Sequence, residues 1–300
     1  MVSLKYVQAN DSIIVMRIID SPFNQGNVVC IELEDGLAFV DASLKAVYTS
    51  KFRSEMEERF GKKASMLFLT HTHRDHYFGI DAFSDLPIIV SQVGLESLAK
   101  SLEEELSEEG RVRYVEAMNE QLAELGALPE GWERWEEDWV PNYLNAKLSR
   151  PTMGVKDEMI VGSEKRSIQF RVVGGHTDCS AYLYVEPDRV LLSGDNLVAE
   201  HAKNSTCMLA LLKPSCMELL KLFEDIGPSK IIPGHGPIVE TDYVRTSREW
   251  FSEMFAKLRS MKDAGVTLEN AVKDARLQEF FEPEKHTQWD RILSEWYQVA

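Results

Sequence analysis

The stretch FLTHTHRDHYFG, residues 68–79, concentrates metal-binding side chains within a few positions. It holds three of the chain's seven histidines and an aspartate: His71, His73, Asp75 and His76. The histidines come directly after an apolar run, residues 65–69, which is typical of a buried strand. Because α/β proteins place ligands where strands end, the sequence predicts a metal-binding loop at one edge of a sheet.

The spacing within this loop indicates how its side chains are arranged. In an extended segment every second side chain projects the same way, so His71, His73 and Asp75 are expected to converge on common ions. His76 would then turn toward a neighbouring position. Three histidines and an aspartate in six positions are more easily explained by metal binding than by surface or core roles.

Three further candidate ligands come at the ends of short apolar runs. They are His176 after FRVVGG, Asp195 after VLLSG, and His235 after KIIPG. Glycines beside each of them would allow close approach of the backbone. Imidazole and carboxylate ligands together suit zinc, and also iron or manganese.

Apolar runs alternate with helical patterns along the chain, which predicts a layered α/β architecture. Strands are expected at 12–19, 27–33, 37–41, 65–69, 86–91, 167–174 and 230–236. Residues 181–195 are expected to form two strands joined by a hairpin turn at EPDR. Helices are expected at 43–60, ending at Gly61, from about 94 to 139, at 214–225 and over the last 60 residues.

Composition limits the classes of function. The formal net charge is −16, and residues 96–139 alone hold 14 acidic and 4 basic side chains. Such a chain is a poor binder of phosphate backbones, so no nucleic-acid partner is expected. No apolar run approaches the roughly 20 residues that cross a bilayer, and the N-terminus does not resemble a secretory signal. The four cysteines are scattered, which favours reduced thiols and a cytoplasmic location.

The acidic helical segment also carries aromatic side chains, for which two interpretations stay open. Trp132, Trp135 and Trp139 are spaced to share one helical face, with Tyr143 nearby. They would form the core of a helical subdomain, or line a substrate pocket. The segment could also build a homodimer interface. His201 and His286 lack the strand-end context and are expected at the surface, although His201, soon after Asp195, could also contact substrate.

The ordered ligands resemble the metallo-β-lactamase superfamily, whose pattern is H-x-H-x-D-H, then a histidine, an aspartate and a histidine. The resemblance covers about residues 27–236 and implies an αββα sandwich, so we expect a single domain over residues 1–300. The resemblance is weaker in an acidic helical insertion at 95–150 and in a helical C-terminal extension at 240–300. It also implies two divalent metal ions. His71, His73 and His176 would hold the first ion, Asp75, His76 and His235 the second, and Asp195 would bridge them. Asp75 would orient the nucleophile, and Asp41 would hold a ligand or loop in place.

The resemblance further implies an enzyme in which a metal-bridged hydroxide cleaves a small ester, thioester or lactone, as in glyoxalase-II-like and lactonase branches. True β-lactamases of this fold usually lack the bridging aspartate, which disfavours antibiotic hydrolysis here. Two alternatives stay open: a phosphodiesterase or nuclease of the same fold, and a metal-bound sensor without turnover.

Overall fold

The computed structural model describes residues 3–19, 25–125, 135–199, 216–274, 277 and 289–300. The chain forms two compact units. The first comprises Met1–Val173 together with Asp178–Leu183, and the second comprises Gly174–Thr177 and Tyr184–Ala300.

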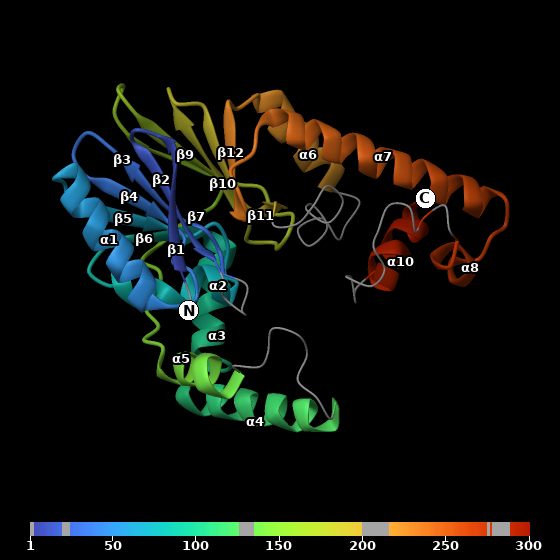
Figure 1. Ribbon diagram of the computed structural model, residues 1–300, viewed down its shortest axis with the longest axis horizontal. Coiled ribbons are helices and arrows are strands. Elements are labelled where there is room, and N and C mark those ends of the chain that lie inside the picture. Colours follow the sequence, from blue (N-terminus) through green and yellow to red (C-terminus); the bar gives the residue numbers. More distant parts are fainter. Residues whose placement is uncertain (1–2, 20–24, 126–134, 200–215, 275–276, 278–288) are drawn as a thin grey trace. The chain divides into compact units, whose positions relative to one another are not determined.

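The first unit contains a seven-stranded sheet whose strand order follows the chain (Figure 1). Its strands are β1 (Ser3–Asn10), β2 (Ile13–Ile19), β3 (Val28–Glu32), β4 (Leu37–Val40), β5 (Ala64–Phe68), β6 (Ile88–Ser91) and β7 (Met153–Val155). The strands from β1 to β4 pair antiparallel, and those from β4 to β7 pair parallel. The sheet therefore begins as a meander and continues through helical crossovers.

The register of two parallel strands positions the metal loop. Val40, the last residue of β4, pairs with Phe68, the last residue of β5. The backbone N–H of Asp41 then donates to the carbonyl of Phe68 (2.8 Å). The residues that follow these two strands are therefore brought together at the same edge of the sheet.

Helix α1 (Ala46–Phe60) packs against this sheet and anchors its core (Figure 1). Phe52 on the helix is fully buried and meets Phe39 of β4 edge to face, with ring centroids 5.9 Å apart. The helix ends at Gly61, as predicted, in the left-handed conformation (φ 61°) that glycine adopts without steric cost.

The segment after β6 is helical, as its leucine spacing predicts. It contains α3 (Gln92–Glu103), α4 (Glu108–Leu125), η2 (Trp135–Trp139) and α5 (Val140–Asn145). The Ser91 side chain accepts from the Gly94 N–H (3.1 Å) and so caps the start of α3. Helices α4 and α5 lie side by side (Figure 1).

The second sheet has the strand order β12-β11-β10-β9-β8. Its strands are β8 (Glu158–Gly162), β9 (Ser167–Val172), β10 (Ala181–Glu186), β11 (Val190–Val198) and β12 (Lys230–His235). Strands β8 and β9 form an antiparallel hairpin in the first unit, where Phe170 stacks on Phe68 with centroids 5.6 Å apart. Strands β11 and β12 are a parallel pair in the second unit.

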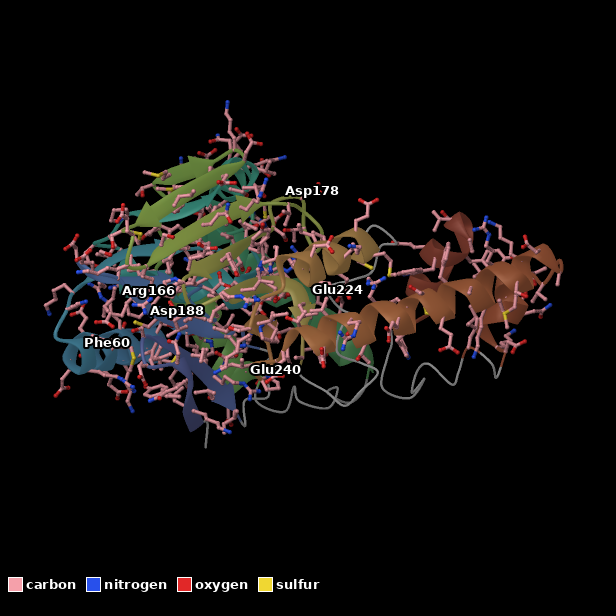
Figure 2. All side chains as sticks on the ribbon, turned by 90° about the horizontal axis from the view of Figure 1, so that it is seen from above. Phe60, Arg166, Asp178, Asp188, Glu224 and Glu240 are labelled. Atoms are coloured by element: carbon pink, nitrogen blue, oxygen red, sulfur yellow. The ribbon has the colours of Figure 1, made fainter. Side chains whose placement is uncertain are left out.

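The remaining helices belong to the second unit. They are α6 (Cys216–Ile226), α7 (Thr241–Asp263), α8 (Leu268–Val272) and α10 (Trp289–Val299). Arg248 on α7 donates to Glu224 on α6 (2.8 Å), and Glu224 is labelled in Figure 2. Phe251 of α7 stacks on the buried Trp296 of α10, with centroids 5.5 Å apart.

Every helix in the part of the chain that the structure describes is too short or too polar to traverse a bilayer.

Candidate metal centre

The predicted metal loop begins directly after β5 and brings its imidazoles together. His71 and His76 are fully buried, whereas His73 is exposed. The His71 ring centroid lies 4.7 Å from that of His73 and 4.3 Å from that of His76. Imidazoles packed this closely can share metal ions between them.

The loop is not extended throughout, which corrects the predicted alternation. Residues 71–73 are non-helical, but Arg74–Tyr77 form the short helix α2, with His73 as its N-cap. Asp75 and His76 are therefore presented from a helical turn, where neighbouring side chains point about 100° apart. The Asp75 Oδ2 atom lies 3.7 Å from the Nε2 atom of His76.

Asp41 connects the ligand loop to the end of β4. Its Oδ1 accepts a hydrogen bond from the Thr70 backbone N–H (2.7 Å). Its Oδ2 accepts a hydrogen bond from the Thr70 hydroxyl (2.8 Å) and also lies 2.8 Å from His76 Nδ1. The carboxylate is almost completely buried, and the residue adopts a left-handed conformation (φ 58°) that is uncommon outside glycine.

These contacts define which ring nitrogens face a metal. An Asp41 carboxylate beside His76 Nδ1 favours the tautomer with hydrogen on Nδ1, which leaves Nε2 as the nitrogen that could bind a metal. Thr70 donates its hydroxyl proton to Asp41 and lies 3.1 Å from His71 Nδ1, which then donates to the threonine oxygen. His71 is thereby also oriented to use Nε2.

Gly26 leaves room for this arrangement. A Cβ atom there would lie 2.6 Å from the Cε1 atom of His76, closer than real contacts allow. The Gly26 N–H donates to the Asp75 carbonyl (3.2 Å), so backbone and ligand loop are in direct contact. A side chain at this position would push His76 away from Asp41.

The second unit holds the other three candidate ligands, centred on Asp195. Its Oδ2 lies 3.5 Å from His176 Nε2, and its Oδ1 lies 3.4 Å from His235 Nε2. Zinc binds these atom types at about 2.0–2.2 Å, so two ligands of one tetrahedral ion lie about 3.3–3.5 Å apart. Each oxygen of Asp195 is therefore placed so that it could bind the same ion as one of the two imidazoles. This set of donor atoms fits metal ions.

A close approach of the Gly234 backbone and the side chain of Asn196 define the surroundings of Asp195 and His176. A Cβ atom on Gly234 would lie 1.9 Å from Asp195 Oδ1. Asn196 accepts from the His176 backbone N–H (2.8 Å) and donates to the Gly174 carbonyl (2.9 Å). One amide side chain therefore fixes both sides of the loop that carries His176.

Thr70 and Asn196 are positioning residues that the sequence analysis did not identify. Asn196 lies within β11, where all nine residues are buried. A buried polar residue beside a predicted ligand is the available signal, because such a group requires hydrogen-bond partners. Thr70 directly precedes the first histidine. Its hydrogen bond to Asp41 spans 29 residues, so no local sequence pattern indicates this partner.

Two aromatic candidates of the helical segment, Trp139 and Tyr143, have described side chains. Trp139 and Tyr143 are buried, and their rings stack with centroids 4.5 Å apart and an interplanar angle of 14°. Both belong to the hydrophobic core cluster of the first unit. Trp132, His201 and His286 lie outside the described residues, and so does the side chain of Trp135.

Comparisons with known proteins identify the family. The family model of the metallo-β-lactamase superfamily matches residues 21–235, a span that includes every candidate ligand. Comparison with curated proteins found no match.

Several solved structures share the fold at low sequence identity. A metallo-β-lactamase from Pontibacter korlensis has a TM-score of 0.57 and 12% identity, with 82% of this chain and 98% of that chain covered. The DIM-1 metallo-β-lactamase has a TM-score of 0.55 and 14% identity, with coverage of 83% and 97%. A metallo-β-lactamase from Hirschia baltica has a TM-score of 0.54 and 13% identity, with coverage of 82% and 96%.

These matches confirm the predicted α/β fold of the metallo-β-lactamase type. The family match covers well over half of the chain, and the His and Asp side chains of both units are of the kinds that could hold metals. The chain therefore belongs to the metallo-β-lactamase superfamily, a superfamily of hydrolases.

Proposed function

We propose that the chain is a dinuclear metal-dependent hydrolase that cleaves a small carboxylic ester, thioester or lactone. The observation that carries this proposal is the Asp195 carboxylate, whose two oxygens each face a different imidazole at 3.4–3.5 Å. A carboxylate in this arrangement is suited to bridge two ions, each of which also binds one of the histidines.

The two ligand sets are proposed to meet around the same pair of ions. His71, His73 and His176 would hold one ion, and Asp75, His76 and His235 the other, with zinc as the first choice and iron or manganese as alternatives. Family membership supports this assembly, because the matched span contains both sets in the superfamily's order. When bound, two ions would lower the pKa of a shared water and stabilise the charge that develops on a carbonyl oxygen.

The chain's own groups supply orientation and proton handling. Asp41 and Thr70 fix the tautomers of His76 and His71, which keeps both rings in their metal-binding orientation. Asp75 is partly exposed, with a side-chain accessibility of 22%, and can orient the attacking water by accepting its hydrogen bond. His73 is exposed and lies on the substrate side of the loop in this proposal.

The substrate is proposed to be a small molecule. The net charge of −16 and the acidic segment at 96–139 would repel a polyanion such as RNA. A phosphodiesterase uses the same type of two-ion site, so it remains the second candidate function.

A substrate panel tests the proposed reaction. Metal-loaded protein is expected to hydrolyse at least one carboxylic ester, thioester or lactone at least about 100-fold faster than bis(4-nitrophenyl) phosphate, with a β-lactam included as a further arm. Chelation should abolish this activity and metal addition should restore it. A phosphodiester as the best substrate would favour the second candidate. Protein that binds metal but turns over none of the panel would favour a sensor.

A further inference from the structure

A cavity of about 340 Å³ lies within the first unit, beside the metal loop. This volume is within the range of small-ligand pockets. Its lining comes from the metal loop, the α3–α4 connection, α4 and α5: Arg74, Glu104, Glu105, Gly110, Arg113, Tyr114 and Tyr143. The helical segment and the loop that carries the histidines therefore both contribute residues to the wall of this cavity.

Arg74 occupies the position between the candidate ligands His73 and Asp75. Its guanidinium carbon lies 4.4 Å from the ring centroid of Tyr114 and 5.3 Å from that of Tyr143. No described residue accepts a hydrogen bond from this guanidinium or forms an ion pair with it. A guanidinium that lies over aromatic rings is held by cation–π attraction, while its five N–H donors can still donate to a ligand.

The aromatic wall behind Arg74 is rigid. Tyr143 is 1% exposed and stacks on Phe78 at 5.3 Å, with an interplanar angle of 7°, as well as on Trp139. Arg111 donates to the Tyr143 and Ala146 carbonyls (3.0 and 2.8 Å) and so fixes the backbone of α5. Burial raises the pKa of the Tyr143 hydroxyl, which therefore stays protonated at neutral pH.

The cavity lining combines two arginines with two glutamates. Arg74 and Arg113 are balanced by Glu104 and Glu105, so the formal charge of the cavity lining is zero. A planar carboxylate can bind a guanidinium through two parallel hydrogen bonds. A dianion such as a phosphate monoester would be repelled more strongly than a monoanion by the two glutamates. The partly exposed ring of Tyr114 favours an apolar body on the ligand.

We propose that this cavity binds an apolar monocarboxylate group, with Arg74 as the main contact and Arg113 as a second one. This proposal rests on the proposed function, and it makes Arg74 a specificity-determining residue of the hydrolase. Arg74 stands between the candidate ligands His73 and Asp75 in the chain, so the cavity and the metal loop share this residue. The enzyme would then prefer ester or thioester substrates that carry a free carboxylate beside an apolar group.

Binding of benzoate, benzamide and phenyl phosphate to the metal-loaded protein tests the proposal. Calorimetry is expected to show that benzoate binds at least about tenfold more tightly than the other two compounds. Arg74→Gln and Arg113→Gln should each reduce this preference, and Arg74→Gln should reduce it more. The matched control is Arg59→Gln, because Arg59 also lies over a ring, that of Phe60 at 5.6 Å, but does not line the cavity.

Three results would overturn the proposal. Benzoate and benzamide could bind equally, phenyl phosphate could bind best, or Arg113→Gln could leave benzoate affinity intact. In the last case benzoate would not be held by the cavity as proposed. Metal content measured on each variant would show whether Arg74→Gln acts through lost metal. Calorimetry measures benzoate affinity without any turnover. Absence of hydrolysis would therefore contradict the proposed reaction, whereas the binding data would still test the proposed carboxylate site.

Discussion

Replacing Asp195 with alanine is expected to reduce kcat on the best ester, thioester or lactone by at least about 10²–10³-fold, the loss caused by removing one preorganised electrostatic group. The physical reason is the position of its two oxygens, 3.4 and 3.5 Å from the metal-binding nitrogens of His235 and His176. In the proposed dinuclear site, each ion would lose a ligand and the pair would lose its bridge without this carboxylate.

A matched variant separates this effect from a general loss of charge. Asp225 is an exposed aspartate of the same unit that pairs with Lys221 on helix α6. Asp225→Ala removes the same chemical group and is expected to leave kcat within about twofold, since exposed pairs contribute little. Similar losses in both variants, with both proteins folded, would show that Asp195 has no special role in the site.

Gly234→Ala is expected to cause a loss of metal and activity comparable to that of Asp195→Ala. The new Cβ atom would lie 1.9 Å from Asp195 Oδ1 and 2.8 Å from the Asp195 backbone nitrogen. Because the backbone cannot move away freely within the parallel pair β11–β12, the carboxylate must shift. The measurements are metal content and kcat, with an expected loss of kcat of at least about 100-fold.

The control for this prediction is another glycine of the second unit. Gly265 has a positive φ of 77°, and a Cβ atom there would meet nothing within 4 Å. Gly265→Ala should therefore lower the free energy of unfolding by about 1–2 kcal/mol through backbone strain, without changing metal content. A Gly234→Ala protein that binds metal and turns over substrate like the wild type would refute the proposed placement of Asp195.

The strands that lead to the metal ligands were predictable from the sequence because they are short, apolar and buried. Strand β11, for example, is buried over its whole length, and His235 ends β12, of which five of six residues are buried. Such runs stand out against the charged chain around them. The candidate ligands could be proposed from the sequence because few residue types bind metals and these residues stand at the ends of such runs.

Other strands gave a weaker signal. The edge strand β1 has the sequence SLKYVQAN, in which polar residues interrupt the apolar ones, and it was not predicted. Strand β8 was also missed, since it alternates between exposed and partly buried residues and leaves Ile160 62% exposed. The three-residue strand β7 is too short to form a pattern. These strands depend on pairing with their neighbours, which a local pattern does not reveal.

The positioning contacts around the ligands also depend on tertiary structure. Asp41 was predicted to hold a ligand or loop, and its bonds to Thr70 and His76 span 29 and 35 residues. The stacking of Arg74 on Tyr114 and Tyr143 joins the metal loop to helices that are 40 or more residues away in the chain. Sequence spacing contains no information about such contacts.

The number of metal ions bound per chain tests the central claim most directly. Protein stripped with a chelator, reloaded with excess zinc and freed of unbound ions should contain two ions per chain by elemental analysis. Asp195→Ala, which removes the bridge, should hold fewer. A folded wild-type protein that binds at most one ion per chain, with zinc, iron and manganese each tried, would contradict the dinuclear assignment.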